Sequence, residues 1–122
     1  MNIREKMELC RKLPIIKTGK IKRDNIDTDK TRGLITIRPI NYPQYIEDWK
    51  KQFNESGLLD FDYIRNSDKI RDKDIDDLTL DETLTMLTSI IRGERFCDGY
   101  IASAIESGAL EKLTTHLHEL CE

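Results

Sequence analysis

The stretch IIRGERFCDGYIA, residues 90–102, decides how the chain is organised. It sets four charged residues within seven positions between two apolar helical segments: Arg92, Glu94, Arg95 and Asp98. Removing charged side chains from water at a helix junction costs free energy unless they pair with one another or contact a ligand. Gly93 and Gly99 allow a tight turn between the segments. The stretch therefore predicts two helices that meet at a polar corner.

Two interpretations of this corner are open. In the first, the four charged side chains form an internal salt-bridge cluster that fixes the angle between the helices. In the second, a helix that begins near Glu94 places its free amides and partial positive charge beside Arg92 and Arg95. That arrangement predicts a pocket for a phosphate or carboxylate, walled by aromatic side chains: Tyr63, Phe96, Tyr100 and Trp49.

Two motifs carry a resemblance to a known family. RGERF at residues 92–96, followed by DG at 98–99 and ASAI at 102–105, together with SGLLDFDY at 56–63, resembles a family of small bacterial and phage domains of unknown function. The resemblance covers about residues 42–120 and leaves the first forty residues outside it. Some members are labelled by association with O-acetyl-ADP-ribose deacetylases, which implies a link to ADP-ribose chemistry.

Helices are predicted on both sides of the corner. Thr79 and Glu82 have the spacing of a capping box, and apolar residues follow at helical spacing up to Ile91. A second helix is expected at about residues 96–106. After Ser107 and Gly108, a final helix carries one apolar face, formed by Leu110, Leu113, Leu117 and Leu120.

The segment before the capping box predicts one further helix. Between Pro43 and Gly57, with Asn41 as a possible cap, one apolar stripe consists of Tyr42, Ile46, Trp49 and Phe53. Trp49 is expected in the core, with a base-stacking wall as the alternative. Asp60 is expected either in the ligand site or paired with Arg92 or Arg95. Residues 66–74 mix both charges and are expected to form a surface face or a loop.

The first forty residues have a different pattern. Residues 2–13 predict a short amphipathic helix that stops at Pro14. Residues 15–22 and 34–38 predict short strands of a small antiparallel ribbon around a polar loop. We therefore expect one mainly α domain over residues 1–122, with about five helices. It divides into a basic helix and β ribbon or arm at 1–40 and a helical body at 41–122.

The charge is unevenly distributed along the chain. Residues 1–40 contain 11 basic and 5 acidic residues, whereas residues 41–122 contain 9 and 18. Either the basic part lies across the acidic body, or it is an arm for a phosphate-rich partner. The acidic body argues against broad binding to nucleic acid, which needs several basic residues on one face.

Cysteines, histidines and hydropathy exclude several classes of protein. Cys10, Cys97 and Cys121 form no CxxC pattern, so no disulfide framework is expected. His116, His118 and Cys121 are also a poor zinc set, because only two of them share one side of a helix. No apolar run could span a bilayer, and the first residues lack the apolar core of a signal peptide. We expect a cytoplasmic protein with neither cofactor nor membrane partner.

No complete catalytic motif occurs, so the sequence favours binding over catalysis. The expected ligand is small, phosphorylated and nucleotide-like, and the resemblance implies derivation from ADP-ribose. Arg92 and Arg95 would contact phosphate oxygens, while Glu94 and Asp98 would accept ribose hydroxyls or hold the arginines. Two alternatives remain: a protein-interaction module, such as a phage-type inhibitor or accessory subunit, and a hydrolase that uses Glu94 or Asp60. The oligomeric state is left open.

Overall fold

The structure, a computed structural model, describes residues 2–21, 42–95 and 99–121. Within these ranges the chain forms six α-helices and one 3-10 turn, with no strand. The mainly α prediction is confirmed there, with one helix more than expected. The elements are α1 (Ile3–Lys12), α2 (Gln44–Glu55), α3 (Tyr63–Ile70), η1 (Ile75–Asp77), α4 (Leu80–Gly93), α5 (Tyr100–Glu106) and α6 (Ala109–Leu120).

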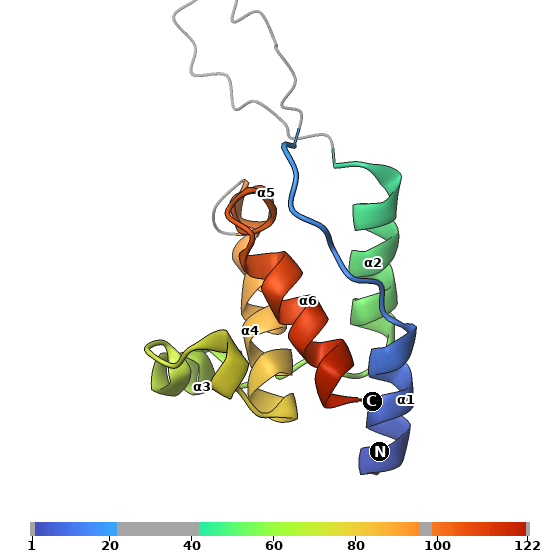
Figure 1. Ribbon diagram of the computed structural model, residues 1–122, viewed down its shortest axis with the longest axis vertical. Coiled ribbons are helices and arrows are strands. Elements are labelled where there is room, and N and C mark those ends of the chain that lie inside the picture. Colours follow the sequence, from blue (N-terminus) through green and yellow to red (C-terminus); the bar gives the residue numbers. More distant parts are fainter. Residues whose placement is uncertain (1, 22–41, 96–98, 122) are drawn as a thin grey trace, which may run out of the picture.

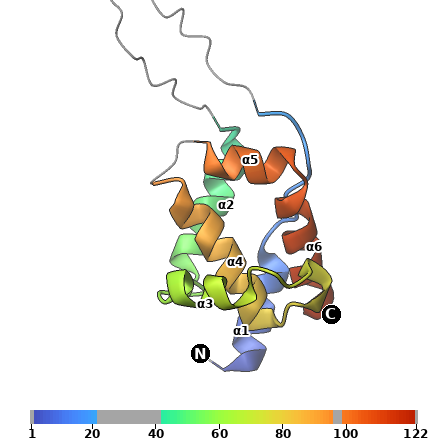
Figure 2. The same ribbon diagram turned by 90° about the vertical axis from the view of Figure 1, so that its left-hand side faces the viewer.

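The helices pack around α4 and α6, which lie side by side in the middle of the molecule (Figure 1). On one side α6 contacts α1, and on the other α4 contacts α3. α5 lies across the ends of α4 and α6, and the C-terminal end of α6 meets α1 (Figure 2). The Nε of Arg11 donates a hydrogen bond of 2.6 Å to the carbonyl oxygen of Cys121, which joins the last turn of α1 to the residue after α6. No described helix is both long and apolar enough to cross a membrane.

The central helix α4 begins where the sequence predicted. The amide of Glu82 donates to the Thr79 hydroxyl at 3.2 Å, and the Thr79 amide donates to the Glu82 carboxylate at 3.0 Å. This reciprocal capping box satisfies amides that the helix itself leaves free. Three threonines of α4 are buried, and Thr88 donates to the Leu84 carbonyl oxygen at 2.8 Å. Its hydroxyl therefore enters the core without losing a hydrogen bond.

The predicted apolar stripes of α2 and α6 form the rest of the core. Ile46, Trp49 and Phe53 are buried on α2, and the rings of Trp49 and Phe53 lie 6.2 Å apart between centroids. Gly57, with a φ of 77°, follows the end of α2 as expected. Three of the four expected leucines of α6 are buried: Leu110, Leu113 and Leu117.

The predicted β ribbon is wrong for residues 15–21, which form neither a strand nor a helix. Residues 14–21, here called the N-terminal strap, lie along α6 and the end of α5 and donate to side chains there. The Ile16 amide donates to the Thr114 hydroxyl at 3.0 Å, and the Thr18 amide donates to the Glu111 carboxylate at 2.6 Å. Helix side chains thus take the place of a partner strand. The second expected strand, residues 34–38, and the expected cap Asn41 lie outside the described residues.

The helix α3 was not predicted. Its second half overlaps residues 66–74, the charged stretch expected to be a surface face or loop, and its one buried residue is Ile70. Packing against α4 stabilises it, and Asp60 fixes its start, because the Asp62 amide and the Asn66 side-chain amide donate to that carboxylate. Tertiary contacts therefore outweigh its weak local signal.

Candidate functional site

The corner between α4 and α5 is built around the Glu94 carboxylate. The Gly99 amide donates to Oε2 at 2.8 Å, and the Ile101 amide donates to Oε1 at 3.0 Å. The Tyr42 hydroxyl donates to Oε1 at 2.6 Å and accepts the Ala102 amide at 3.1 Å. Together Glu94 and Tyr42 bind the free amides at the start of α5, where a negative charge is favoured. The anion at this helix start is therefore the protein's own side chain.

Close packing at the same corner depends on Gly93. A Cβ added to Gly93 would lie 2.8 Å from Cδ1 of Tyr100, so the Tyr100 ring occupies the space that a side chain would need. Tyr100 is still 43% exposed, so part of this residue remains open to solvent. Because Gly93 has no side chain, the Tyr100 ring of α5 can pack against the end of α4.

The two arginines of the corner have no carboxylate partner within the described ranges. Arg92, in the last turn of α4, is half-buried, and Arg95 is exposed. Neither guanidinium forms an ion pair there, because the Glu94 oxygens accept from the α5 amides and Tyr42 instead. Phe96 and Asp98 lie outside the described residues, so their expected roles stay predictions.

Both arginines line a groove of about 370 Å³, here called the arginine groove. It is lined by Lys50, Asn54, Leu59, Ile91, Arg92, Glu94 and Arg95. Three cations therefore converge on one hollow whose carboxylate is already hydrogen-bonded. Lys50 lies 5.7 Å above the Tyr42 ring centroid and only loosely near Glu47, at 3.8 Å.

Lys50 and Asn54 were missed by reasoning from the sequence. They are four residues apart on α2, so they share one face of that helix. That spacing is the one local signal, and it does not say which helix the face meets. The docking of α2 beside the end of α4 is a tertiary contact.

Of the expected aromatic walls, the three that the structure describes do not line the groove. Trp49 is 1% exposed in the core, and Tyr63 is half-buried at the start of α3. Neither of these two side chains lines the arginine groove. Tyr100 contacts Gly93, which follows the lining residue Arg92, but Tyr100 itself does not line the groove either.

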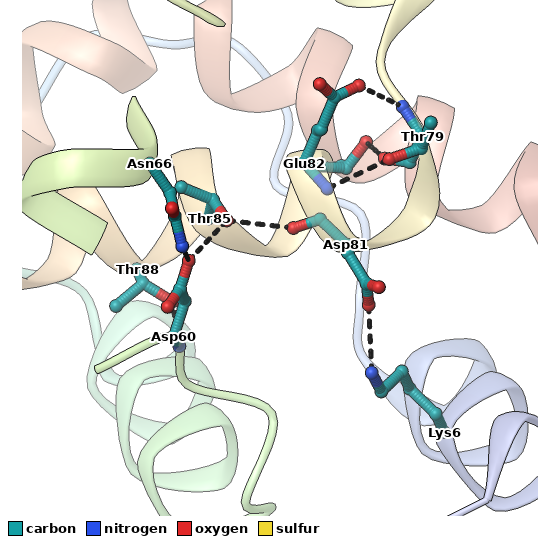
Figure 3. Close-up of polar contacts among 9 residues, drawn as sticks. Lys6, Asp60, Asn66, Thr79, Asp81, Glu82, Thr85 and Thr88 are labelled. Atoms are coloured by element: carbon teal, nitrogen blue, oxygen red, sulfur yellow. Dashed lines mark hydrogen bonds and ion pairs between the residues drawn. The ribbon is translucent and has the colours of Figure 1, made fainter. Parts of the chain in front are cut away.

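A second hollow of about 480 Å³, here called the Asp60 cavity, lies where α1, α3 and α4 approach one another. It is lined by Lys6, Gly57, Leu58, Leu59, Asp60, Asn66, Lys69, Ile70, Asp81, Glu82, Leu84 and Thr85. Figure 3 shows Asp60 held between Asn66 and Thr85, while Lys6 reaches from α1 to Asp81. Its wall therefore combines an apolar surface with ionised groups.

Asp60 has neutral partners in place of the expected arginine. Asn66 Nδ2 lies 2.8 Å and the Thr85 hydroxyl 2.6 Å from Oδ2, and the Asp62 amide donates to Oδ1 at 2.9 Å. Burial raises the pKa of this carboxyl, but the hydrogen bonds from Asn66, Thr85 and Asp62 outweigh burial and lower the pKa below its ordinary value. Asp60 is therefore ionised at neutral pH.

The histidines fasten α6 to its neighbours. His116 Nε2 lies 2.8 Å from the Leu78 carbonyl oxygen, and His118 Nε2 lies 2.5 Å from that of Leu13. A carbonyl oxygen only accepts, so each ring donates through Nε2. In the described part of the chain, no three His, Cys, Asp or Glu side chains are grouped so as to hold a metal ion.

Cys10 and Cys121 meet where α1 contacts the end of α6, and both are buried free thiols. Burial, reinforced by the neighbouring Cys121, raises the pKa of Cys10 to about 12. Burial also raises the pKa of Cys121. These thiols are therefore packing groups and not nucleophiles at neutral pH. Cys97 lies outside the described residues.

The fold and the two hollows define a class: an all-helical domain with a cationic surface groove beside a cavity of mixed polarity. The chain belongs to DUF6508, a family of unknown function whose family model matches residues 4–122. That match includes α1 and the N-terminal strap, so the expectation that the first forty residues lie outside the family is wrong. No curated protein and no solved structure matches the chain.

Proposed function

We propose that this protein binds a small phosphorylated ligand in the arginine groove. The observation that carries the proposal is the convergence of Lys50, Arg92 and Arg95 on one hollow. Like charges that share a hollow repel one another unless an anion lies between them. The arginines have no described carboxylate partner, so a phosphate would supply the missing negative charge.

Each groove residue has a distinct part in this proposal. A guanidinium donates two parallel hydrogen bonds to phosphate oxygens, so Arg92 and Arg95 would orient the group. Lys50 would add a mobile point charge, and the Asn54 amide would add a neutral donor. A nucleotide-like and ADP-ribose-derived ligand remains the finer proposal, supported by the motif resemblance at residues 92–99 and by the exposed ring of Tyr100 beside Gly93.

Isothermal titration calorimetry with inorganic phosphate, AMP and ADP-ribose tests the proposal. Removal of a hydrogen bond to a charged group costs about 1.5–3 kcal/mol, so Arg92→Ala should weaken binding by roughly tenfold or more. Arg65→Ala is the matched control, because it removes an exposed guanidinium from α3, outside the groove. Absence of heat from all three compounds at millimolar concentration would overturn the proposal.

The protein-interaction alternative is supported by a different surface. Phe61 is 82% exposed and Ile64 is 73% exposed, at and just before the start of α3. Two large apolar side chains so close together on the surface are typical of a docking patch. Co-purification from a native lysate should give a stoichiometric partner that Phe61→Ser loses. Equal recovery with both forms would remove this alternative.

The hydrolase alternative has less support. A general base works best when its pKa lies near the operating pH, whereas hydrogen bonds lower the pKa of Asp60. Both oxygens of Glu94 already accept backbone amides. The hydrolase alternative would be favoured if the protein turned over an ADP-ribosyl or phosphate ester. Glu94→Gln would then have to abolish this turnover while the protein stayed folded.

A further inference from the structure

The arginine groove and the Asp60 cavity have one lining residue in common, Leu59. Leu59 is half-buried in the segment between α2 and α3, so both hollows adjoin this one apolar residue. Volumes of about 370 and 480 Å³ are each in the range of small-molecule sites. One ligand could therefore contact both hollows across Leu59.

Asp60 differs from the other carboxylates that line its cavity. Asp81 pairs with Lys6 at 2.8 Å, and Glu82 pairs with Lys73 at 2.8 Å. Asp60 is held by neutral donors alone, so within the described residues no cation neutralises its charge. Because these donors fix its orientation, an ionised acceptor is preorganised at the cavity wall.

The remaining lining residues restrict the chemistry of the group that fits there. Lys6 and Lys69 would repel an ammonium group, and the three carboxylates would repel a second phosphate. A hydroxyl both donates and accepts, so it matches a wall that contains carboxylates as well as Lys69 and Asn66. The apolar surface of Leu58, Ile70 and Leu84 suits the C–H face of a ring.

We infer that the ligand is a sugar phosphate, whose phosphate lies in the arginine groove and whose hydroxyl-bearing ring lies in the Asp60 cavity. The phosphate half of this inference rests on the proposed function. The sugar half rests on the Asp60 carboxylate: Oδ2 already accepts from Asn66 and Thr85, whereas Oδ1, within the described residues, accepts only the Asp62 amide and would accept a ring hydroxyl as well. Glu94, expected from the sequence to accept ribose hydroxyls, instead holds the start of α5.

Calorimetry with inorganic phosphate, ribose and ribose 5-phosphate separates the two halves. A charged acceptor strengthens a hydrogen bond, so ribose 5-phosphate should bind about tenfold more tightly than phosphate. Asp60→Asn should abolish that difference and leave the phosphate affinity unchanged, whereas Arg92→Ala should weaken both ligands. Asp72→Asn, an exposed aspartate outside the cavity, is the matched control.

Amide chemical shifts of the unmodified protein test the same inference without depending on the stability of a variant. Phosphate should shift the amides near Arg92 and Arg95, and ribose 5-phosphate should also shift those of Asp60, Asn66 and Thr85. If phosphate binds and the sugar adds neither affinity nor shifts at Asp60, the inference fails while the proposed function stands. If ribose alone binds at Asp60 and phosphate does not bind, the proposed function and the sugar-phosphate ligand both fail.

Discussion

At the scale of single residues, Glu94 is a charged residue of the motif that stabilises the fold. Its two oxygens receive the Gly99 and Ile101 amides and the Tyr42 hydroxyl, so one side chain links α2, α4 and α5. The motif was correctly recognised as a helix junction. Which of its four charged residues would cap the helix could not be read from spacing, because Tyr42 is distant in the chain.

We predict that Glu94→Gln lowers the free energy of unfolding by about 1–2 kcal/mol, as expected for loss of a charged cap. The substituted amide has one accepting oxygen, so either the Gly99 or the Ile101 amide loses its acceptor. Urea denaturation followed by circular dichroism measures the change, with the exposed Glu55→Gln as control. Phosphate affinity within twofold of the unmodified protein would agree with the capping role. Weaker binding at unchanged stability would contradict it.

Gly93→Ala should also destabilise the protein, by roughly 1–3 kcal/mol, because the new methyl group would overlap the Tyr100 ring. Alanine is otherwise favoured over glycine within a helix by about 1 kcal/mol. In a Tyr100→Ala background the same substitution should therefore stabilise the protein. A double-mutant cycle from thermal melts measures this reversal of sign, and its absence would show that the ring does not restrict Gly93.

At the scale of elements, the N-terminal strap explains why a strand pattern need not produce a sheet. Ile16 and Ile21 are buried, whereas the residues between them are exposed, so burial does not alternate as it would along a half-buried strand. Three of its backbone amides donate hydrogen bonds to side chains of α5 and α6, so these amides have acceptors without a second strand. The isoleucine-containing run that predicted a strand does not identify the hydrogen-bond partner of its backbone.

Thr114→Val should lower the free energy of unfolding by about 1–3 kcal/mol, because the buried Ile16 amide would lose its acceptor. Valine preserves the shape of threonine, so packing changes little. Thr115→Val on the same helix is the matched control, since no described amide donates to that side chain. Hydrogen exchange at the Ile16 amide should accelerate in the first variant alone. Unchanged exchange would mean that the strap is held by its apolar contacts.

At the scale of the whole molecule, the end of α1 is held against the residue that follows α6. Cys10 on α1 and Cys121 after α6 are in contact, and Arg11 binds the Cys121 carbonyl oxygen. The arrangement agrees with the family match, which begins at residue 4 and includes α1. The first helix is therefore an integral part of the fold.

In a Cys97→Ser background, a thiol reagent should modify Cys10 and Cys121 no faster than the protein unfolds at neutral pH. Both thiols are buried, and a pKa of about 12 leaves Cys10 almost entirely protonated. Stopped-flow absorbance with an aromatic disulfide reagent measures the rate, and urea should increase it in proportion to the unfolded population. Rapid modification of the folded protein would show that α1 opens locally from α6.

The sequence by itself determined the helices whose signals are local: the capping box of α4, the stop of α1 before Pro14, and the apolar stripes of α2 and α6. These signals act within a few residues, so they can be recognised before any packing is known. Only the tertiary structure decided the course of the strap, the formation of α3 and the neutral partners of Asp60. It also decided that Lys50, Arg92 and Arg95 line one groove. Each of these depends on side chains far apart in the chain, and the free energy that selects them arises when the helices pack.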